Sequence, residues 1–486
     1  MNNSRDLQKT REAGIALVLT MLALALISVL GLIMTMNATM ELRISSNSES
    51  HAQAALAAIS GLEHARIAVN RLDFDALLRG PDGVYDTSAA YMNEAKTFGF
   101  RLPFSLLTAQ KLNIESPLDS IEYRSDDGII STGALWGISG AALIPQEGIA
   151  LWADNPDGTE KRIVSRYFVK VTDNNEEASE LAADATDNPF IDGDGIIIVR
   201  SIGVARTIAD TAGESVRNNA AAVFESRLRR SAAWDLGPAL TIIGATPNAA
   251  FSGSPEIYGG SAAGIGILNT DSVNAGLPEV LLPEASAVAG NISGGGFAIH
   301  SIRDISDSVR NHRDKSLLFS AGWLMDFIER RSRNIADIVY NGDMVFTGAS
   351  QPFLGFYDKT KPWNDSLQKP YFVFVNGNLT ATNGLAGAGV LVVTGSLQCS
   401  GNLDYRGLIL VLGAGQLALG AEGPGIRGGV ITGRLLYSGG EAAFGAAQID
   451  IGGFTRITAD KELVRMALRL FPVEQISFRE IAGSDP

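Results

Sequence analysis

The sequence of 486 residues is poor in the side chains that most often carry chemistry, with one cysteine, Cys399, and four histidines. A lone cysteine cannot form a disulfide within the chain, and we expect Cys399 to be a small buried residue of a strand. The histidines are isolated and lack the spacing of metal ligands, which argues against a zinc site. Neither a P-loop nor a GxSxG sequence is present.

A basic stripe is also missing. Lys and Arg number 39 against 53 Asp and Glu, the formal net charge is −14, and the basic residues are scattered, which argues against a nucleic-acid partner. Residues 423–428, GPGIRG, fit the pattern GxGxxG, but strand-like GGVITG follows where a dinucleotide site needs a helix. We interpret GPGIRG as a turn between strands. Only Asp404 and Arg406 pair opposite charges in this region, so we predict that the chain is not an enzyme.

What the sequence does have is a long apolar run near its start. No residue from Ile15 to Met36 is charged, and as a helix this run is about 33 Å long, enough to cross a membrane. A secretory signal peptide has a shorter apolar segment, about 7–15 residues, closely followed by a small-residue cleavage site. Basic residues outweigh acidic ones before the run and Glu41 follows it, so we expect the short leader in the cytoplasm and the rest outside.

The helix is predicted to continue beyond the apolar run. Residues 51–78 are rich in helix formers and place a mainly apolar stripe on one face. We expect one extended helix with a lipid-compatible first half and a second half that packs under a globular domain. The polar residues Ser45 to Ser48 are a predicted weak point between the two halves.

This region resembles the N-terminal region of PilX-type minor pilins of type IV pilus systems, over roughly residues 9–75. The resemblance rests on Gly14 before Ile-Ala-Leu-Val, then Ser28, Leu30-Gly31-Leu32, Glu41-Leu42-Arg43, Asn47, Ala54-Ala55 and Gly61-Leu62-Glu63. It implies cleavage by a prepilin peptidase after Gly14, which leaves Ile15 as the mature N-terminus. It also implies an inner-membrane location with the C-terminus outward, and other pilins as partners of the helix.

Two residues depart from the major-pilin pattern that goes with this resemblance. Leu19 stands at the fifth mature position, where major pilins carry a glutamate, and Ala13 replaces the usual basic residue before the glycine. Without that carboxylate no upper neighbour is required, and a bulky head does not repeat easily along a shaft. We therefore expect a minor pilin or pseudopilin-like subunit at a tip or priming position. The alternative is a single-pass membrane-anchored binding or scaffold protein that never enters a filament.

The middle of the chain, about residues 76–235, is expected to be a mixed α/β head. Residues 162–174 and 195–205 are β-branched and predict strands, and residues 220–231 predict a strand or a short helix. An acidic, turn-rich loop follows the first strand. Its oxygen-bearing side chains are those of Asp173, Asn175, Asp184, Asp187, Asp192 and Asp194. Carboxylates on such a loop are typical Ca²⁺ ligands, although no EF-hand pattern is present, and a solvated loop without calcium is the other interpretation.

The last part of the chain repeats short apolar runs. FVFVNG, VLVVTG and LILVLG end at Gly377, Gly395 and Gly413, which are equally spaced, and such a regular period is typical of a β-solenoid. It also resembles the β-helical regions attached to some PilX-like proteins. Within it, residues 317–342 place an apolar stripe on a predicted helix that covers a flank or an open end. The stripe consists of Leu324, Phe327, Ile328, Ile335, Ile338 and Val339.

The expected fold class is therefore α+β: a long N-terminal transmembrane pilin-type helix, a mixed α/β head, and a C-terminal β-solenoid with an inserted amphipathic helix. The expected segments are a leader at 1–14, the helix at 15–75 (transmembrane about 15–36), the head at 76–235, the solenoid at 236–450 with its helical insertion at about 300–345, and an extension at 451–486.

Overall fold

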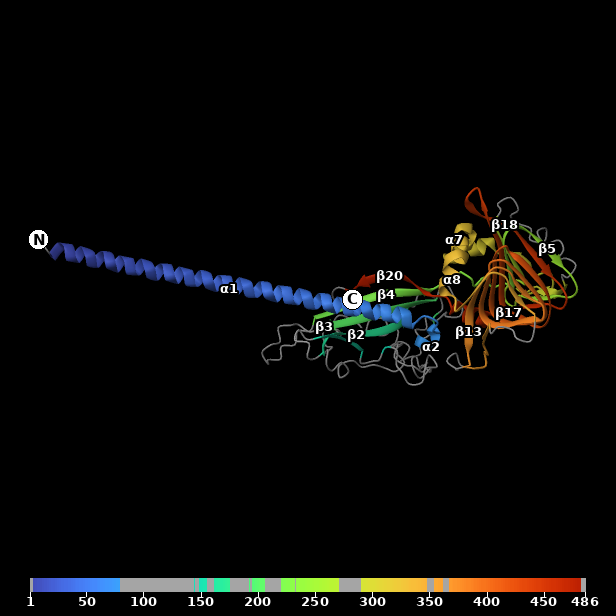
Figure 1. Ribbon diagram of the computed structural model, residues 1–486, viewed down its shortest axis with the longest axis horizontal. Helices are drawn as coiled ribbons and strands as arrows, with labels where there is room; N and C mark the ends of the chain where they lie inside the picture. The colour runs from blue at the N-terminus through green and yellow to red at the C-terminus, as the bar shows by residue number, and fades with distance from the viewer. Residues whose placement is uncertain are drawn as a thin grey trace.

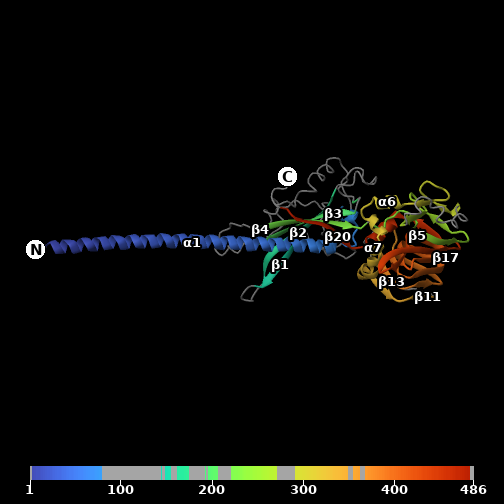
Figure 2. The same cartoon turned by 90° about the horizontal axis from the view of Figure 1, so that it is seen from above.

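The computed structural model describes the backbone of residues 3–78, with side chains from Val18 to Phe74 and of Leu77 and Leu78, and then most of the chain from residue 144. The later described residues are 144, 148–154, 161–174, 192, 195–205, 220–231, 233–270, 290–347, 354–361 and 367–481. A long helix comes first, an antiparallel sheet lies beside its second half, and a large β-rich region lies beyond that sheet (Figure 1). Figure 2 shows the same order from above, with the free half of the helix pointing away from the β-rich region.

The first element, α1 (Asn3–Ala68), is one continuous helix of 66 residues. It contains no proline, and the predicted weak point at Ser45 to Ser48 does not interrupt it. The predicted end at residue 75 was too late, because the chain turns after Ala68 and Arg71 adopts a left-handed φ of 67°. The short helix α2 (Phe74–Leu78) follows this turn.

The second half of α1 packs on a five-stranded antiparallel sheet in the order β1-β2-β3-β4-β20. The strands are β1 (Ile149–Asp154), β2 (Lys161–Asp173), β3 (Ile196–Ala205), β4 (Ala220–Arg230) and β20 (Val473–Glu480). Ala54, Ala58 and Leu62 of α1 are buried against this sheet. A Cβ on Gly203 of β3 would collide with the backbone of Ala54 and Ala58, so glycine sets how closely helix and sheet approach. Residues 220–230 form the strand β4, one of the two predicted alternatives.

The β-rich region contains a second sheet of 15 strands, most of which pair in parallel. The strands are β5 (Leu240–Phe251), β6 (Glu256–Tyr258), β7 (Ile265–Asn269), β8 (Ile292–Ser293), β9 (Ile302–Asp304), β10 (Ile338–Asn341), β11 (Met344–Phe346), β12 (Gly355–Phe356), β13 (Lys369–Asn376), β14 (Leu379–Ala381), β15 (Gly384–Val393), β16 (Ser396–Gly413), β17 (Gln416–Ser438), β18 (Glu441–Ile451) and β19 (Arg456–Ala459). Val373 pairs with Leu391, and Leu391 pairs with Ile409. The equal spacing found in the sequence is thus the register between neighbouring parallel strands.

The unbroken apolar runs of β13, β15 and β16 follow from burial on both faces. Val373, Leu391 and Ile409 belong to one core, whereas Phe372, Val390 and Leu408 belong to a second core under the helices. A column of glycines, Gly389, Gly407 and Gly428, stacks in register at the start of these runs, with φ from 117° to 134°. A Cβ on Gly407 would collide with the carbonyl oxygen of Gly389, so the column requires glycine. Cys399 is buried in β16, as expected, and burial raises the pKa of its thiol to about 12.

The predicted amphipathic helix is broken into short pieces. These are α6 (Ser306–Arg310), η5 (Lys315–Phe319), α7 (Ala321–Asp326), η6 (Phe327–Arg331) and α8 (Ser332–Ile335). The prediction that Ile338 and Val339 continue the helix was wrong, because both lie in β10, which pairs in parallel with β13. The Asp337 carboxylate accepts a hydrogen bond from Phe372 N at 2.8 Å and fixes the start of that pairing. At Ile338 and Val339, pairing with β13 therefore determines the structure, although the spacing of apolar residues favours a helix.

The interpretation of GPGIRG as a turn was also wrong, because residues 423–428 lie within β17. Gly423, Gly425 and Gly428 have positive φ and bend this strand without ending it.

The C-terminal segment first covers the β-rich region and then leaves it. The helix α9 (Lys461–Leu468) is capped by the Asp460 side chain and buries Leu463, Val464 and Met466. The chain then enters β20, which pairs antiparallel with β4, and Val473 lies opposite Arg230. All the chain between Arg230 and Val473 is therefore inserted between two neighbouring strands of the first sheet (Figure 1).

Candidate functional site

The first half of α1 is an exposed apolar surface. Every large apolar side chain from Val18 to Ile44 is between 47% and 70% exposed. Among the described residues, one helix is long and apolar enough to cross a membrane, with a mean hydropathy of 2.5 in its best window. Its hydroxyl groups are satisfied internally, since Ser28 Oγ donates to Leu24 O and Thr35 Oγ1 donates to Gly31 O, both at 2.8 Å. These bonds remove the cost of placing hydroxyls in lipid.

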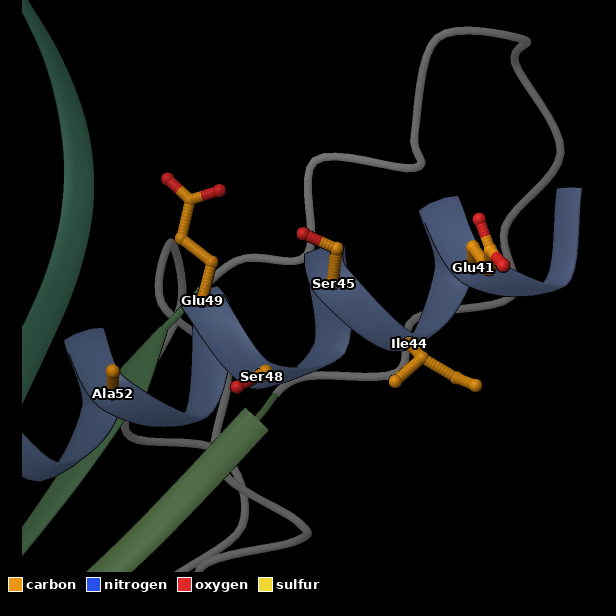
Figure 3. Close-up of a pocket in the computed structure, with 6 residues that line it drawn as sticks. All are labelled: Glu41, Ile44, Ser45, Ser48, Glu49 and Ala52. Carbon is orange, nitrogen blue, oxygen red and sulfur yellow. The ribbon is translucent and has the colours of Figure 1, made fainter. Parts of the chain in front are cut away.

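The same helix changes character at its middle. Glu41, Ile44, Ser45, Ser48, Glu49 and Ala52 line an open hollow along it (Figure 3). Figure 3 shows Ser45 and Glu49 projecting from the side of the helix opposite Ile44. Ser50, 1% exposed, begins the packed half, where the core residues Ala54, Ala57 and Ala58 follow. The helix thus passes within a few residues from an exposed apolar surface to the core of a folded head.

The predicted cleavage residues, Gly14 and Ile15, lie within the backbone of α1 but outside its described side chains. Cleavage between them stays a prediction. Leu19, the fifth residue after Gly14, is 68% exposed on the apolar half.

Of the six residues predicted to offer calcium ligands, the structure describes only two. Asp173 is buried at the end of β2, and the Asp192 carboxylate accepts a hydrogen bond from Gly195 N at 2.8 Å. Asn175, Asp184, Asp187 and Asp194 lie outside the described residues. Within the part of the chain that the structure describes, no group of three or more His, Cys, Asp or Glu residues is placed to hold a metal. Calcium binding stays a prediction.

The end of α1 is tied to the β-rich region by charged contacts that the sequence did not reveal. Arg71 pairs with Asp337 at 2.7 Å, and Asp73 pairs with Arg469 at 2.7 Å. Between these pairs, the Arg230 guanidinium donates to Leu72 O at 2.7 Å and lies 4.0 Å from the centre of the Phe74 ring. Burial lowers the pKa of Arg230 to about 10, while the Asp192 carboxylate favours its charged form.

His64 connects the packed half of α1 to the sheet. Its Nδ1 lies 2.9 Å from the hydroxyl of Tyr167 on β2, and the two rings meet edge to face. Burial lowers the pKa of His64 and raises the pKa of Tyr167. The pair is therefore neutral at neutral pH, in keeping with a packing role.

The structure adds a third residue to the predicted pair of opposite charges. Asp404 Oδ1 lies 3.6 Å from Arg406 Nε and 3.5 Å from an Nη of Arg427. Arg427 pairs in register with Arg406 of the preceding strand. Sequence reasoning missed Arg427 because the register shifts between Asn402 and Asp404 and breaks the regular spacing of the earlier strands.

No protein-family model matches the chain, and neither a curated protein nor a solved structure matches it. The functional argument therefore rests on the long helix, its packed head and the sequence pattern at the N-terminus.

Proposed function

We propose that this protein is a non-enzymatic minor pilin or pseudopilin-like subunit of a type IV pilus or a related filament. The observation that carries the proposal is the division of α1 into an exposed apolar half and a half buried under an antiparallel sheet. A plain membrane anchor needs only the first half. A filament subunit needs both, because the apolar half packs among other subunits while the rigid second half holds the head at a fixed distance.

We place the subunit in the inner membrane before assembly, with the head outward, and at the tip or priming position of the filament. Its proposed partners are a prepilin peptidase and the helices of other pilins. Leu19 supports the end position, because it offers no carboxylate to an incoming amino terminus. The bulk of the β-rich region supports it too, since copies of so large a head would collide along a tightly packed shaft.

We further infer that the β-rich region is a β-solenoid. Two successive parallel registers with the same spacing support this, together with the apolar column of Val373, Leu391 and Ile409 inside the stack. In a β-solenoid, the residues inside the stack are buried by the neighbouring coils of the same repeat, and no separate sheet is needed to cover them.

The proposal is tested by the mature N-terminus. Mass spectrometry of the protein from cells with active prepilin peptidase should find a chain that begins at Ile15. Gly14→Val should leave the full-length precursor in the membrane, whereas Gly31→Val should be processed normally. Gly31 is the matched control, because it lies in the same apolar helix and a Cβ there meets no other atom within 4 Å.

An intact Met1 in the wild-type protein, or normal processing of Gly14→Val, would contradict the assignment. Either result would favour a single-pass membrane protein whose head serves as a binding or scaffold module outside any filament.

A further inference from the structure

The outer face of six parallel strands in the β-rich region presents aligned polar side chains. The strands run in the order β15-β16-β17-β19-β6-β8. One row crosses all six in register, and it consists of Ala388, Arg406, Arg427, Thr458, Tyr258 and Ser293. Neighbouring strands lie about 4.8 Å apart, so the row brings these side chains close together across the sheet. Ala388 at the β15 end is buried, and the other five are at least partly exposed.

A second row runs parallel to the first, two residues earlier on each strand. Ala386 pairs with Asp404, Asp404 pairs with Gly425, and Arg456 pairs with Glu256. Small residues dominate the β15 edge, and Gly425 leaves the middle of the row without a side chain. We call the two rows together the outer face. Its charged side chains are partly exposed: those of Asp404, Arg406 and Arg427 are 31%, 28% and 39% exposed, and those of Arg456 and Glu256 are 54% and 58% exposed.

The two central arginines of the outer face are poorly matched by their own surroundings. Arg406 and Arg427 lie directly opposite each other on adjacent strands, where like charges destabilise a sheet. The carboxylate of Asp404 lies 3.5 to 3.6 Å from both, and its Oδ1 forms no hydrogen bond; the partly exposed Asp358 carboxylate also interacts with the charge of Arg406. Arg427 Nε is shielded from solvent and also has no hydrogen-bond partner. The Arg427 side chain as a whole is 39% exposed, so an oxyanion from solvent can reach its outer nitrogens and offset the charge of the two adjacent arginines.

One of the two central arginines is fixed in place, and an aromatic ring lies beyond the other along the same row. Arg406 is fixed by a hydrogen bond to Tyr357 O at 2.7 Å, so its guanidinium is preorganised. On the other side, Tyr258 is 51% exposed, and next to it Arg456 Nε donates to Glu256 at 2.7 Å. Arginine pairs with carboxylates, an exposed tyrosine ring packs on sugar rings, and Asp and Glu accept hydrogen bonds from sugar hydroxyls.

We infer that the outer face binds a linear polysaccharide that carries carboxylate groups. The mixture of charges on the outer face distinguishes between possible polyanionic ligands. The face holds three arginines among two carboxylates, on a chain with a net charge of −14. A nucleic acid has a phosphate on every nucleotide and needs a basic track without interspersed acids. A uronic-acid polysaccharide offers hydroxyls beside each carboxylate, which matches alternating donors and acceptors. This binding goes beyond the proposed role in a filament and does not depend on it.

The test uses the full-length protein in detergent micelles, with polygalacturonate as the probe and neutral dextran and double-stranded DNA as comparisons. The wild type should bind polygalacturonate and neither of the other polymers. Arg427→Gln should weaken binding about tenfold or more, the effect of losing one charge-assisted hydrogen bond. Tyr258→Leu should weaken it by a smaller factor.

Arg434→Gln is the matched control, because Arg434 lies on the same strand beyond the bend at Gly428 and outside the outer face. It should bind as the wild type does. The melting temperature of Arg427→Gln should change little, because its ion pair with Asp404 is long, at 3.5 Å, and partly exposed, and the change also relieves the repulsion from Arg406. Weak binding then cannot be attributed to unfolding.

Failure of the wild type to bind polygalacturonate, equal binding of DNA, or an equal loss in Arg434→Gln would overturn the inference. The Gly14→Val precursor should bind as the wild type does, so this result and the test of the filament proposal fail independently.

Discussion

At the scale of single residues, close approach and burial decide which positions matter. Gly203 and Gly61 let α1 lie against the sheet, and a Cβ on either would meet atoms of the opposite element. Neither glycine has the positive φ that would mark it as a turn residue. Their role is visible only once helix and sheet are placed together, and the sequence offers no local signal for it.

Gly203→Ala should destabilise the head by at least about 1–3 kcal/mol, because the new methyl group collides with backbone that cannot move independently of α1. Chemical unfolding of the detergent-solubilised protein measures the loss. Gly420→Ala is the control, since a Cβ there meets nothing within 4 Å and the change should be nearly neutral. Equal stability of the two variants would contradict the packing described for α1.

His64 makes the stability of the head depend on pH. Burial lowers its pKa in the folded state below the ordinary value of 6.5, so the unfolded chain binds a proton more readily. The stability that neutral His64 contributes is present above pH 6.5 and is lost as the pH falls through the lowered value. His64→Gln should reduce the drop in melting temperature between pH 7.5 and pH 5. His51→Gln, on the exposed side of the same helix, should keep that drop, and an unchanged drop in His64→Gln would refute this reasoning.

At the scale of elements, β20 is held to the first sheet by more than its backbone. The Glu225 carboxylate on β4 is 2% exposed and accepts hydrogen bonds from Arg200 at 2.7 Å and Arg479 at 2.9 Å. Phe478 stacks on Phe224 with ring centres 5.3 Å apart. A strand whose outward side chains are mostly exposed therefore stays paired because it neutralises a buried charge on its neighbour.

Arg479→Gln should destabilise the first sheet by about 1–2 kcal/mol, because one oxygen of the buried Glu225 carboxylate loses its donors. Hydrogen exchange of the β4 and β20 amides would locate the effect. Arg66→Gln breaks an exposed ion pair with Glu63 on α1 and should cost no more than about 0.5 kcal/mol. Similar losses in the two variants would show that Glu225 does not anchor β20.

At the scale of the whole molecule, the β-rich region is an insert in a hairpin. It begins after Arg230 and ends before Val473, two residues that pair directly across β4 and β20. The Arg71–Asp337, Asp73–Arg469 and Arg229–Asp314 ion pairs tie the insert to the helix and the first sheet. The helix and five-stranded sheet have their own core, separate from those of the insert.

Replacing residues 231–472 by Asn-Gly should therefore leave a folded helix and sheet, because a two-residue turn closes directly paired antiparallel strands. The shortened protein should still enter the membrane, be cut after Gly14 and join filaments, and it should lose binding to polygalacturonate. Circular dichroism and the mature N-terminus check folding and processing. Deletion of residues 473–486 is the comparison and should unfold the first sheet while the insert remains. An aggregated or unprocessed replacement would contradict the separation of the two parts.

Features that depend on neighbours along the chain could be predicted from the sequence. The apolar run set the exposed half of α1, β-branched content placed β2 and β3, and the regular spacing of apolar runs fixed the register of β13, β15 and β16. Each pattern is local or strictly periodic, so its physical consequence can be read without knowing what lies across the fold.

Contacts across the fold set the remaining features. The predicted helical stripe ends before Ile338, because Ile338 pairs with the parallel strand β13. The last strand, β20, pairs with β4, which ends far earlier in the chain, at Arg230. Arg427 reached Arg406 through a shifted register that no fixed interval describes. In each case the stabilising free energy comes from contacts between segments far apart in sequence, and such contacts produce no periodic pattern in the sequence.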